Sequence, residues 1–336
     1  MRNELSKTRQ NGFVVVVVLS MVSVLAVLLL GFNYMSRKSL IAVEDFQKSQ
    51  QAINCARAGL NIAIAAIRSS EDVCTDKKLA ELLSEKTFFS VGDGSCSVTI
   101  IDESSKLNVN LLKDKDGKMN LARVSQLLRI IDVLNRPAFI EKDLPRIGYG
   151  IVPAIIDWID TDDEVTYLSF IQQENLGAES DSYLDRNYPC KNNLLETTDE
   201  LLPVKGVTPE VFERIYNYVT VKGDGKININ SASKAVIESL SEKMDAAVAQ
   251  VIVERRKVKP FGSVMELRDV SGMTDDIYYS IKDMVTISPQ DPYYLVRSSG
   301  RVGQVDCTIV ALLRKNTQDK MVDVILYKEL KLVRRG

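Results

Sequence analysis

The sequence contains no histidine in its 336 residues. This absence excludes histidine-based catalytic triads, haem ligation by histidine and most zinc sites. The five cysteines include no Cys-x-x-Cys pair, so a thiolate metal site is not indicated either. The net charge is only −2, which gives no sign of the strongly basic surface that binds nucleic acid. The length predicts two domains, or one domain with a large insertion.

One long apolar run lies close to the N-terminus. From Phe13 to Phe32 there are 20 consecutive uncharged residues. As a helix these residues are about 30 Å long, the thickness of a bilayer core. The charged residues before the run are Arg2, Lys7 and Arg9 against Glu4 alone, and this basic excess predicts that the N-terminus stays in the cytoplasm. We therefore expect a single transmembrane helix over 13–34, with everything after Tyr34 on the other side of the membrane.

The junction before the apolar run carries a specific pattern. Lys7-Thr-Arg-Gln-Asn-Gly12 is followed directly by Phe13, which resembles the leader of type IV pilins and of the pseudopilins of type II secretion. In those families a membrane peptidase cuts between Gly and Phe and methylates the new N-terminus. The resemblance implies a leader peptide over 1–12 and cleavage between Gly12 and Phe13. An uncleaved signal anchor is the alternative interpretation.

The helix that begins in the apolar run is predicted to continue beyond the membrane. Phe46, Ile53, Leu60 and Ile67 recur every seven residues and form a narrow apolar stripe without an interrupting proline. This spacing predicts one helix to about residue 69, with its second half packed on a globular body. A coiled-coil dimer is the alternative, although the stripe is short for one.

Strand and helix patterns divide the rest of the chain. Period-two alternation occurs before residue 112 and after residue 290, whereas 121–287 has helical periodicity. We predict an α+β fold in which a long N-terminal helix packs on an antiparallel sheet and a large all-α domain is inserted into that sheet. The predicted divisions are 35–112 (periplasmic helix and first strands), 113–288 (α-helical insertion) and 289–336 (remaining strands). Residues 298–303 are expected to form a turn.

Cysteine spacing suggests one disulfide. Cys74 and Cys96, which are 22 residues apart in the sequence, are the candidate pair. Closing such a loop stabilises a fold by roughly 3 kcal/mol on the chain-entropy model. Isolated buried thiols are an equally good interpretation.

Two neighbouring loops are rich in acidic residues. Asp157-Trp-Ile-Asp-Thr-Asp-Asp-Glu164 is followed by a second acidic stretch over 176–185. Oxygen-rich loops suit Ca²⁺, but Val165 and Ile171 stand where an EF-hand needs Gly and Glu. A calcium site requires the second loop to fold back onto the first, and its candidate ligands are Asp160, Asp162, Asp163, Glu179, Asp181 and Asp185. The alternative is a solvated acidic loop with Asp157 as a helix cap or ion-pair partner.

The acidic residues do not indicate an enzyme. A hydrolase could use paired carboxylates such as Asp157 and Asp160, but no nucleophile with a neighbouring base accompanies them. We therefore predict no catalytic residues.

Residues 226–267 resemble the helix-hairpin-helix domains of DNA-uptake proteins. In those domains a glycine-containing hairpin presents backbone N–H groups to phosphate. Here the hairpin at 240–245 has no glycine, and Glu242 and Asp245 would repel an anion. We expect a structural domain that binds no nucleic acid. A membrane-anchored DNA-binding protein of a competence system is the alternative function.

The ordered set of motifs resembles the type II secretion protein K family of minor pseudopilins. Most pilins carry Glu as the fifth mature residue, and this chain has Val17 there, as is the habit of that family. Further matching motifs are Asp157–Asp163, Gly177-Ala-Glu179, Asp199–Gly206 and Ile227–Ala232. The motifs extend over roughly residues 10 to 290.

The resemblance implies a structural role in protein export. It implies a single-pass inner-membrane protein with its body in the periplasm, at the tip of the pseudopilus. The implied partners are the minor pseudopilins I and J, other pseudopilins, the inner-membrane assembly platform and the prepilin peptidase. Family members bind calcium in the helical region, which by acidic character corresponds to the candidate ligands named above.

Overall fold

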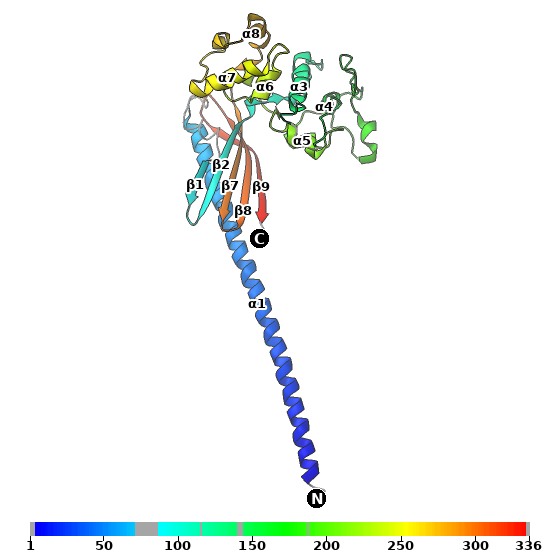
Figure 1. Cartoon of the computed structure of the whole chain (residues 1–336), viewed down its shortest axis with the longest axis vertical. Coiled ribbons are helices and arrows are strands. Elements are labelled where there is room, and N and C mark those ends of the chain that lie inside the picture. The colour runs from blue at the N-terminus through cyan, green and yellow to red at the C-terminus, as the bar shows by residue number, and fades with distance from the viewer. Residues whose placement is uncertain (1–3, 71–86, 115, 140–143, 187, 334–336) are drawn as a thin grey trace.

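A computed structural model describes residues 4–333, apart from 71–86, 115, 140–143 and 187. Its dominant element is α1, one uninterrupted helix over Glu4–Ser69 that projects far from the body of the protein (Figure 1). Side chains from Phe13 to Phe46 are exposed, whereas Ile53, Leu60 and Ile67 are buried. The predicted stripe is therefore confirmed from Ile53 onward, and Phe46 lies outside the packed region.

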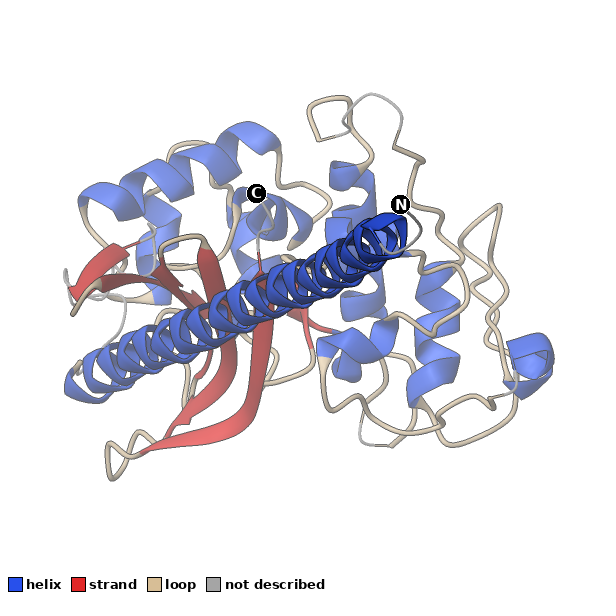
Figure 2. Ribbon diagram, turned by 90° about the horizontal axis from the view of Figure 1, so that it is seen from below, coloured by secondary structure: helices blue, strands red, loops and turns tan. Residues whose placement is uncertain are grey.

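Five strands form one antiparallel sheet against the second half of α1. The helix crosses one face of the strands, as the view from below shows (Figure 2). The spatial order is β1-β2-β7-β8-β9, so β2 and β7 are neighbours although the whole insertion separates them in sequence. The strands are β1 (Thr87–Val91), β2 (Gly94–Asp102), β7 (Tyr293–Val302), β8 (Val305–Lys315) and β9 (Val322–Val333).

The closest helix–sheet contact uses small residues on both sides. On β7, Ser298 donates a hydrogen bond from its Oγ to the carbonyl oxygen of Ala56 at 2.7 Å. At Gly300 a Cβ atom would lie 2.0 Å from the carbonyl oxygen of Ala52, so only glycine fits there. The predicted turn over 298–303 is wrong, because β7 continues to Val302 and the chain reverses at Gly303. Small residues occur here because a helix passes over them.

The insertion begins earlier than the predicted boundary at residue 113. Leu107–Asn108 (β3) does not join the main sheet but pairs in parallel with Val219–Thr220 (β4) inside the insertion. The side chains of Leu107, Val109 and Leu112 belong to the insertion's own apolar core. The insertion therefore extends from the end of β2 at residue 102 to the start of β7 at residue 293.

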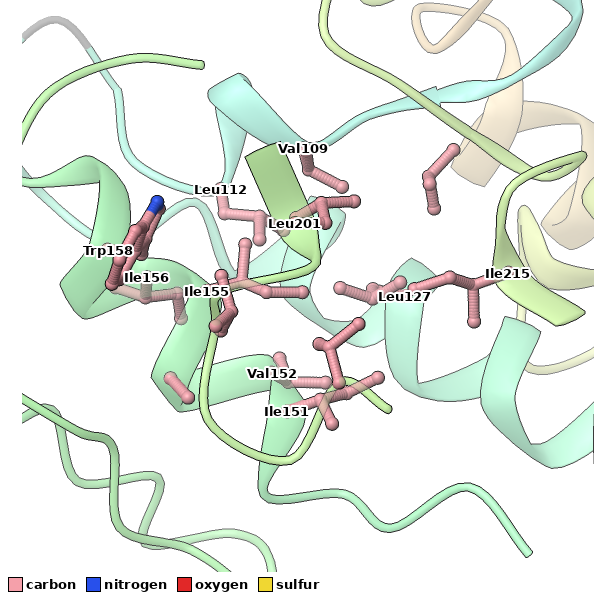
Figure 3. Close-up of a cluster of buried hydrophobic side chains, with 14 of the residues drawn as sticks. Val109, Leu112, Leu127, Ile151, Val152, Ile155, Ile156, Trp158, Leu201 and Ile215 are labelled. Atoms are coloured by element: carbon pink, nitrogen blue, oxygen red, sulfur yellow. The ribbon is translucent and has the colours of Figure 1, made fainter. Parts of the chain in front are cut away.

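The described residues of the insertion form two apolar cores. The first extends from Leu107 to Val221 and the second from Ile227 to Val285. Figure 3 shows the centre of the first, where Leu127, Ile155 and Ile215 point toward one another. A parallel pairing of Ile227–Asn228 (β5) with Val285–Thr286 (β6) closes the second. The helices are α3 (Leu121–Leu134), α4 (Ile151–Ile159), α5 (Pro209–Ile215), α6 (Lys234–Ser239), α7 (Ala246–Val258) and α8 (Asp275–Ile281).

A buried carboxylate connects the sheet to the insertion. Asp102, the last residue of β2, accepts hydrogen bonds at Oδ2 from Asn228 Nδ2 (2.8 Å) and Ser231 Oγ (2.6 Å). Its Oδ1 accepts from the backbone N–H of Ser104 at 2.9 Å. Burial raises the pKa of this carboxyl group, while these hydrogen bonds act in the opposite direction. The second core of the insertion is thus fixed to the end of the strand from which the insertion departs.

Candidate cation site

Three carboxyl groups meet at the C-terminal end of α4. Asp157 lies in the last turn of this helix, Asp160 caps its C-terminus, and Glu179 comes from the loop that returns to it. One oxygen from each residue lies within 4.8 Å of the others. All three residues are buried, with exposed fractions of 0%, 6% and 5% respectively. We call Asp157, Asp160 and Glu179 the carboxylate cluster.

Several oxygens of the carboxylate cluster are buried without hydrogen-bond partners among the described residues. They are Asp157 Oδ2, Asp160 Oδ1 and both oxygens of Glu179. Burying an ionised group without a partner is costly, so such oxygens need either a proton or a cation. The oxygen chemistry, the burial and the close spacing all fit a hard cation such as Ca²⁺.

The remaining oxygens of the cluster are bound by the protein. Asp157 Oδ1 accepts from the backbone N–H of Thr166 at 2.9 Å, and Asp160 Oδ2 accepts from Lys113 Nζ at 2.5 Å. Lys113 supplies one positive charge to three carboxyl groups. The described surroundings therefore leave negative charge in a buried place.

This charge and burial raise the pKa of all three groups. Burial is the main cause in each case; it raises the pKa of Glu179 to about 7 and that of Asp160 to about 6. Neighbouring carboxylates raise the pKa of Glu179 further, whereas Lys113 lowers that of Asp160. The pKa of Asp157 is raised by burial, against the hydrogen bond from Thr166. Glu179 and Asp160 therefore change protonation close to neutral pH.

The absence of a side chain at Gly177 leaves space for the carboxylate of Asp157. A Cβ atom at Gly177 would lie 2.1 Å from Asp157 Oδ2 and 2.9 Å from the carbonyl oxygen of Pro153. The same residue donates its backbone N–H to the carbonyl oxygen of Thr166 at 2.9 Å. The loop that carries Glu179 can therefore lie directly against α4 only because residue 177 has no side chain.

The structure brings together two of the six ligands expected from the sequence. Asp160 and Glu179 belong to the cluster, whereas Asp162 is half exposed and forms an ion pair with Lys113 at 3.4 Å. Asp163 Oδ1 accepts a hydrogen bond from Asn192 Nδ2 at 3.1 Å. These two acids are close in sequence but do not enter the cluster.

The two acids expected from the second loop are directed away from the site. Tyr183, at the centre of the 3-10 helix η3 (Ser180–Arg186), is fully buried, and its ring centroid lies 5.0 Å from that of Trp158. Asp181 and Asp185 flank it in sequence and are exposed. The aromatic contact fixes the orientation of η3, so these carboxylates face solvent instead of the cluster.

Asp157 is the member of the carboxylate cluster that was not among the candidate ligands expected from the sequence. In the sequence, Asp157 stands out as a carboxylate within the otherwise apolar segment Ile151–Ile159. The structure buries this segment along its whole length. The carboxyl group accepts a hydrogen bond from Thr166 in the loop beyond the helix, so the expected role as a local cap accounts for only one oxygen. The sequence signal for this cluster member was therefore an acid within an apolar helix that has no basic neighbour in the sequence.

In the helix-hairpin-helix region, a carboxylate occupies the N-terminus of α7. Asp245 caps α7, and its Oδ1 accepts from the backbone N–H groups of Ala247 (2.9 Å) and Val248 (2.8 Å). A phosphate would need those N–H groups, and it would meet a carboxylate in their place. Nothing in the described structure favours the DNA-binding alternative.

The fold defines an α+β, pilin-like protein: a long, apolar N-terminal helix packed on an antiparallel sheet, with a helical domain inserted between two neighbouring strands. Residues 105–224 match the family model for type II secretion system (T2SS) protein K, and residues 222–286 match that for the helix-hairpin-helix motif. The first match assigns residues 105–224 to a type II secretion protein K domain, and it supports the minor pseudopilin that the motifs predicted.

Comparison with solved structures gives the same fold. The chain resembles a chain of the GspK–GspI–GspJ complex from the type 2 secretion system of enterotoxigenic Escherichia coli, with a TM-score of 0.61 and 19% sequence identity. The match covers 88% of this chain and 99% of the other. Comparison with curated protein sequences gives no match.

Proposed function

We propose that this subunit occupies the tip of the periplasmic pseudopilus and acts there as a structural component without catalytic activity. The observation that carries the proposal is the position of the insertion, which lies at the end of the molecule opposite the N-terminus of α1 (Figure 1). Pseudopilins assemble through their long helices, so a subunit placed above this one would collide with the insertion. The subunit therefore fits only the first position of the fibre.

The length and composition of α1 support the proposal that the precursor is inserted in the inner membrane. It is the one helix of the described chain that is long and apolar enough to cross a membrane, with a mean hydropathy of 3.2 in its most apolar window. Its side chains from Phe13 to Phe46 are exposed on the single chain and are available to contact lipid or other subunits. In the fibre these surfaces would pack against the helices of neighbouring subunits. The body beyond the helix would lie in the periplasm.

The proposed neighbours are the minor pseudopilins I and J. A similar chain was crystallised in a complex of GspK, GspI and GspJ. Val17 is the fifth residue after the proposed cleavage site, so this subunit offers no carboxylate for the N-terminal amine of a neighbour. The first subunit of a fibre can lack that interaction because it follows no other. Further proposed partners are the other pseudopilins, the assembly platform and the prepilin peptidase.

Labelling the subunit in assembled fibres tests the proposed position. Gold particles directed at an epitope in the insertion are expected at one end of each pseudopilus. Particles directed at the major pseudopilin, as the control, are expected along the whole length. Labelling of the insertion at many positions along a fibre would contradict the tip assignment.

Processing of the leader is a second test of the proposed assembly route. The variant Gly12→Leu is expected to remain at precursor size, because the peptidase of this class requires a small residue before the cut. Mass spectrometry of the membrane-extracted protein measures whether residues 1–12 and the methyl group on Phe13 are present. Asn11→Ala, one position away, serves as the control and is expected to be processed. A shortened, methylated Gly12→Leu protein would refute the cleavage site.

We further propose that the carboxylate cluster holds one Ca²⁺ ion. Asp157, Asp160 and Glu179 would provide its protein ligands. The ion would supply the positive charge that the buried oxygens lack and would join α4 to the loop carrying Glu179. Its role would be to stabilise the insertion.

A further inference from the structure

Three buried thiols meet at the membrane-proximal end of the helix–sheet contact. Cys55 lies on α1, Cys96 on β2 and Cys307 on β8, and all three belong to one small apolar cluster. All are free in the structure. Cys74, the partner predicted for Cys96 from sequence spacing, lies outside the described residues, so that pairing stays a prediction.

The strand register places Cys55 over the position between Cys96 and Cys307. Gly300 on β7 pairs with Cys96 on one side and with Cys307 on the other. The Cβ atom of Cys55 lies 2.9 Å from the position that a Cβ atom at Gly300 would take. Because neighbouring strands are about 4.8 Å apart, Cys55 sits about one strand spacing from each of the other two cysteines.

The side chain of Cys55 is turned toward β2. Its Sγ lies 2.8 Å from the Cβ position of Gly94, which is two residues before Cys96 on the same face of the strand. The Sγ of Cys96 lies 3.2 Å from the Cβ position of Gly59, one helical turn after Cys55. Each thiol thus lies against a glycine of the opposite element.

The third thiol points elsewhere. Cys307 Sγ lies 3.8 Å from the carbonyl oxygen of Ser49 and 3.9 Å from its Oγ. Ser49 lies nearly two helical turns before Cys55, on the stretch of α1 that approaches β8. Cys307 therefore serves as an internal control, since it is in the same cluster but faces away from the other pair.

We propose that Cys55 and Cys96 form a disulfide that fastens α1 covalently to β2. The two thiols lose two protons and two electrons and gain one S–S bond. The electrons reduce the disulfide of a thiol oxidoreductase or of oxidised glutathione to two thiols. In the structure the two Sγ atoms lie over Gly94 and Gly59, so the bond requires both side chains to rotate about their Cα–Cβ bonds away from these glycines and toward each other. Formation of the bond in the cell rests on the proposed periplasmic location.

Peptide mapping of the full-length protein tests this pairing. Protein extracted from membranes without reductant is alkylated under denaturing conditions, digested and analysed without reduction. One linked pair of peptides, containing Cys55 and Cys96, is expected. Cys55→Ser and Cys96→Ser should each abolish it, whereas Cys307→Ser and Cys74→Ser should retain it.

A parallel sample incubated with oxidised glutathione separates the pairing from the location. A Cys55–Cys96 link found only in that sample would support the pairing and contradict the periplasmic placement. Alkylation of both thiols in both samples, or a Cys74–Cys96 link in their place, would overturn the proposal.

Discussion

Calcium is expected to raise the unfolding temperature of the wild-type chain but not of Glu179→Gln. A ligand at 100 times its Kd stabilises the folded state by about 2.7 kcal/mol, which for an insertion of this size corresponds to a rise of roughly 5–10 °C. The glutamine removes one of the three carboxylates that would bind the ion. Without calcium and above about pH 7, where Glu179 is ionised, the variant should be more stable than the wild type, because a buried, unpartnered charge is gone. Scanning calorimetry with and without calcium measures both effects.

Asp181→Asn provides the matched control for this prediction. It also removes one carboxylate from the same loop region, but from an exposed position in η3. Its response to calcium should equal that of the wild type. If Glu179→Gln responds as strongly as Asp181→Asn, the carboxylate cluster is not the calcium site.

The calcium effect should also depend on pH in a defined direction. The pKa of Glu179 is raised from 4.5 to about 7, so the calcium-free folded state binds a proton that the unfolded state has already lost. Stability without calcium should therefore fall as the pH rises from about 4.5 to about 7. Calcium competes with these protons, so the calcium-induced rise in Tm should grow over the same interval. A rise that is equal at pH 5 and pH 8 would argue against these ligands.

Gly300→Val is expected to detach the second half of α1 from the sheet. The new side chain would meet the backbone of α1 at Ala52 and Ala56, with a Cβ contact of 2.0 Å to the Ala52 oxygen. Backbone atoms cannot rotate away, so we expect a loss of about 3 kcal/mol in the free energy of unfolding, at the upper end for overpacking. Urea unfolding in detergent, followed by circular dichroism, measures the loss.

Ser299→Val is the control for the effect of a β-branched side chain on the same strand. Ser299 faces away from α1, where its Oγ is 2.8 Å from Thr308 Oγ1. Its replacement should cost clearly less than Gly300→Val. Equal stability of the two variants would show that the helix does not require the glycine.

The same glycine explains where sequence reasoning about the fold failed. The segment Ser298–Gly303 contains the small residues that commonly mark turns, and local pattern alone favoured that interpretation. Their actual cause is tertiary: α1 passes so closely that two positions of β7 must be small. By contrast, the strand alternation at 305–311 and the stripe from Ile53 to Ile67 depend on burial along one face, so the sequence revealed them correctly.

The cation site shows a similar division between local and distant information. The sequence indicated the correct loops, since acids that are dense in sequence mark a negatively charged region. It could not say which of them would be buried. That choice depends on Tyr183, which turns η3 outward, and on Gly177, which lets the loop approach Asp157. Both effects act between segments that only the folded chain brings together.

The insertion leaves and re-enters the sheet at adjacent strands, and this has a consequence for biosynthesis. Residues Asp102 and Tyr294 are paired across β2 and β7, so the inner edge of β2 stays unpaired until the ribosome has added nearly the entire polypeptide. During that interval α1 covers only the two strands β1 and β2, and a two-stranded hairpin is only marginally stable by itself. Completion of the body, and hence readiness for the fibre, must follow synthesis of the last three strands.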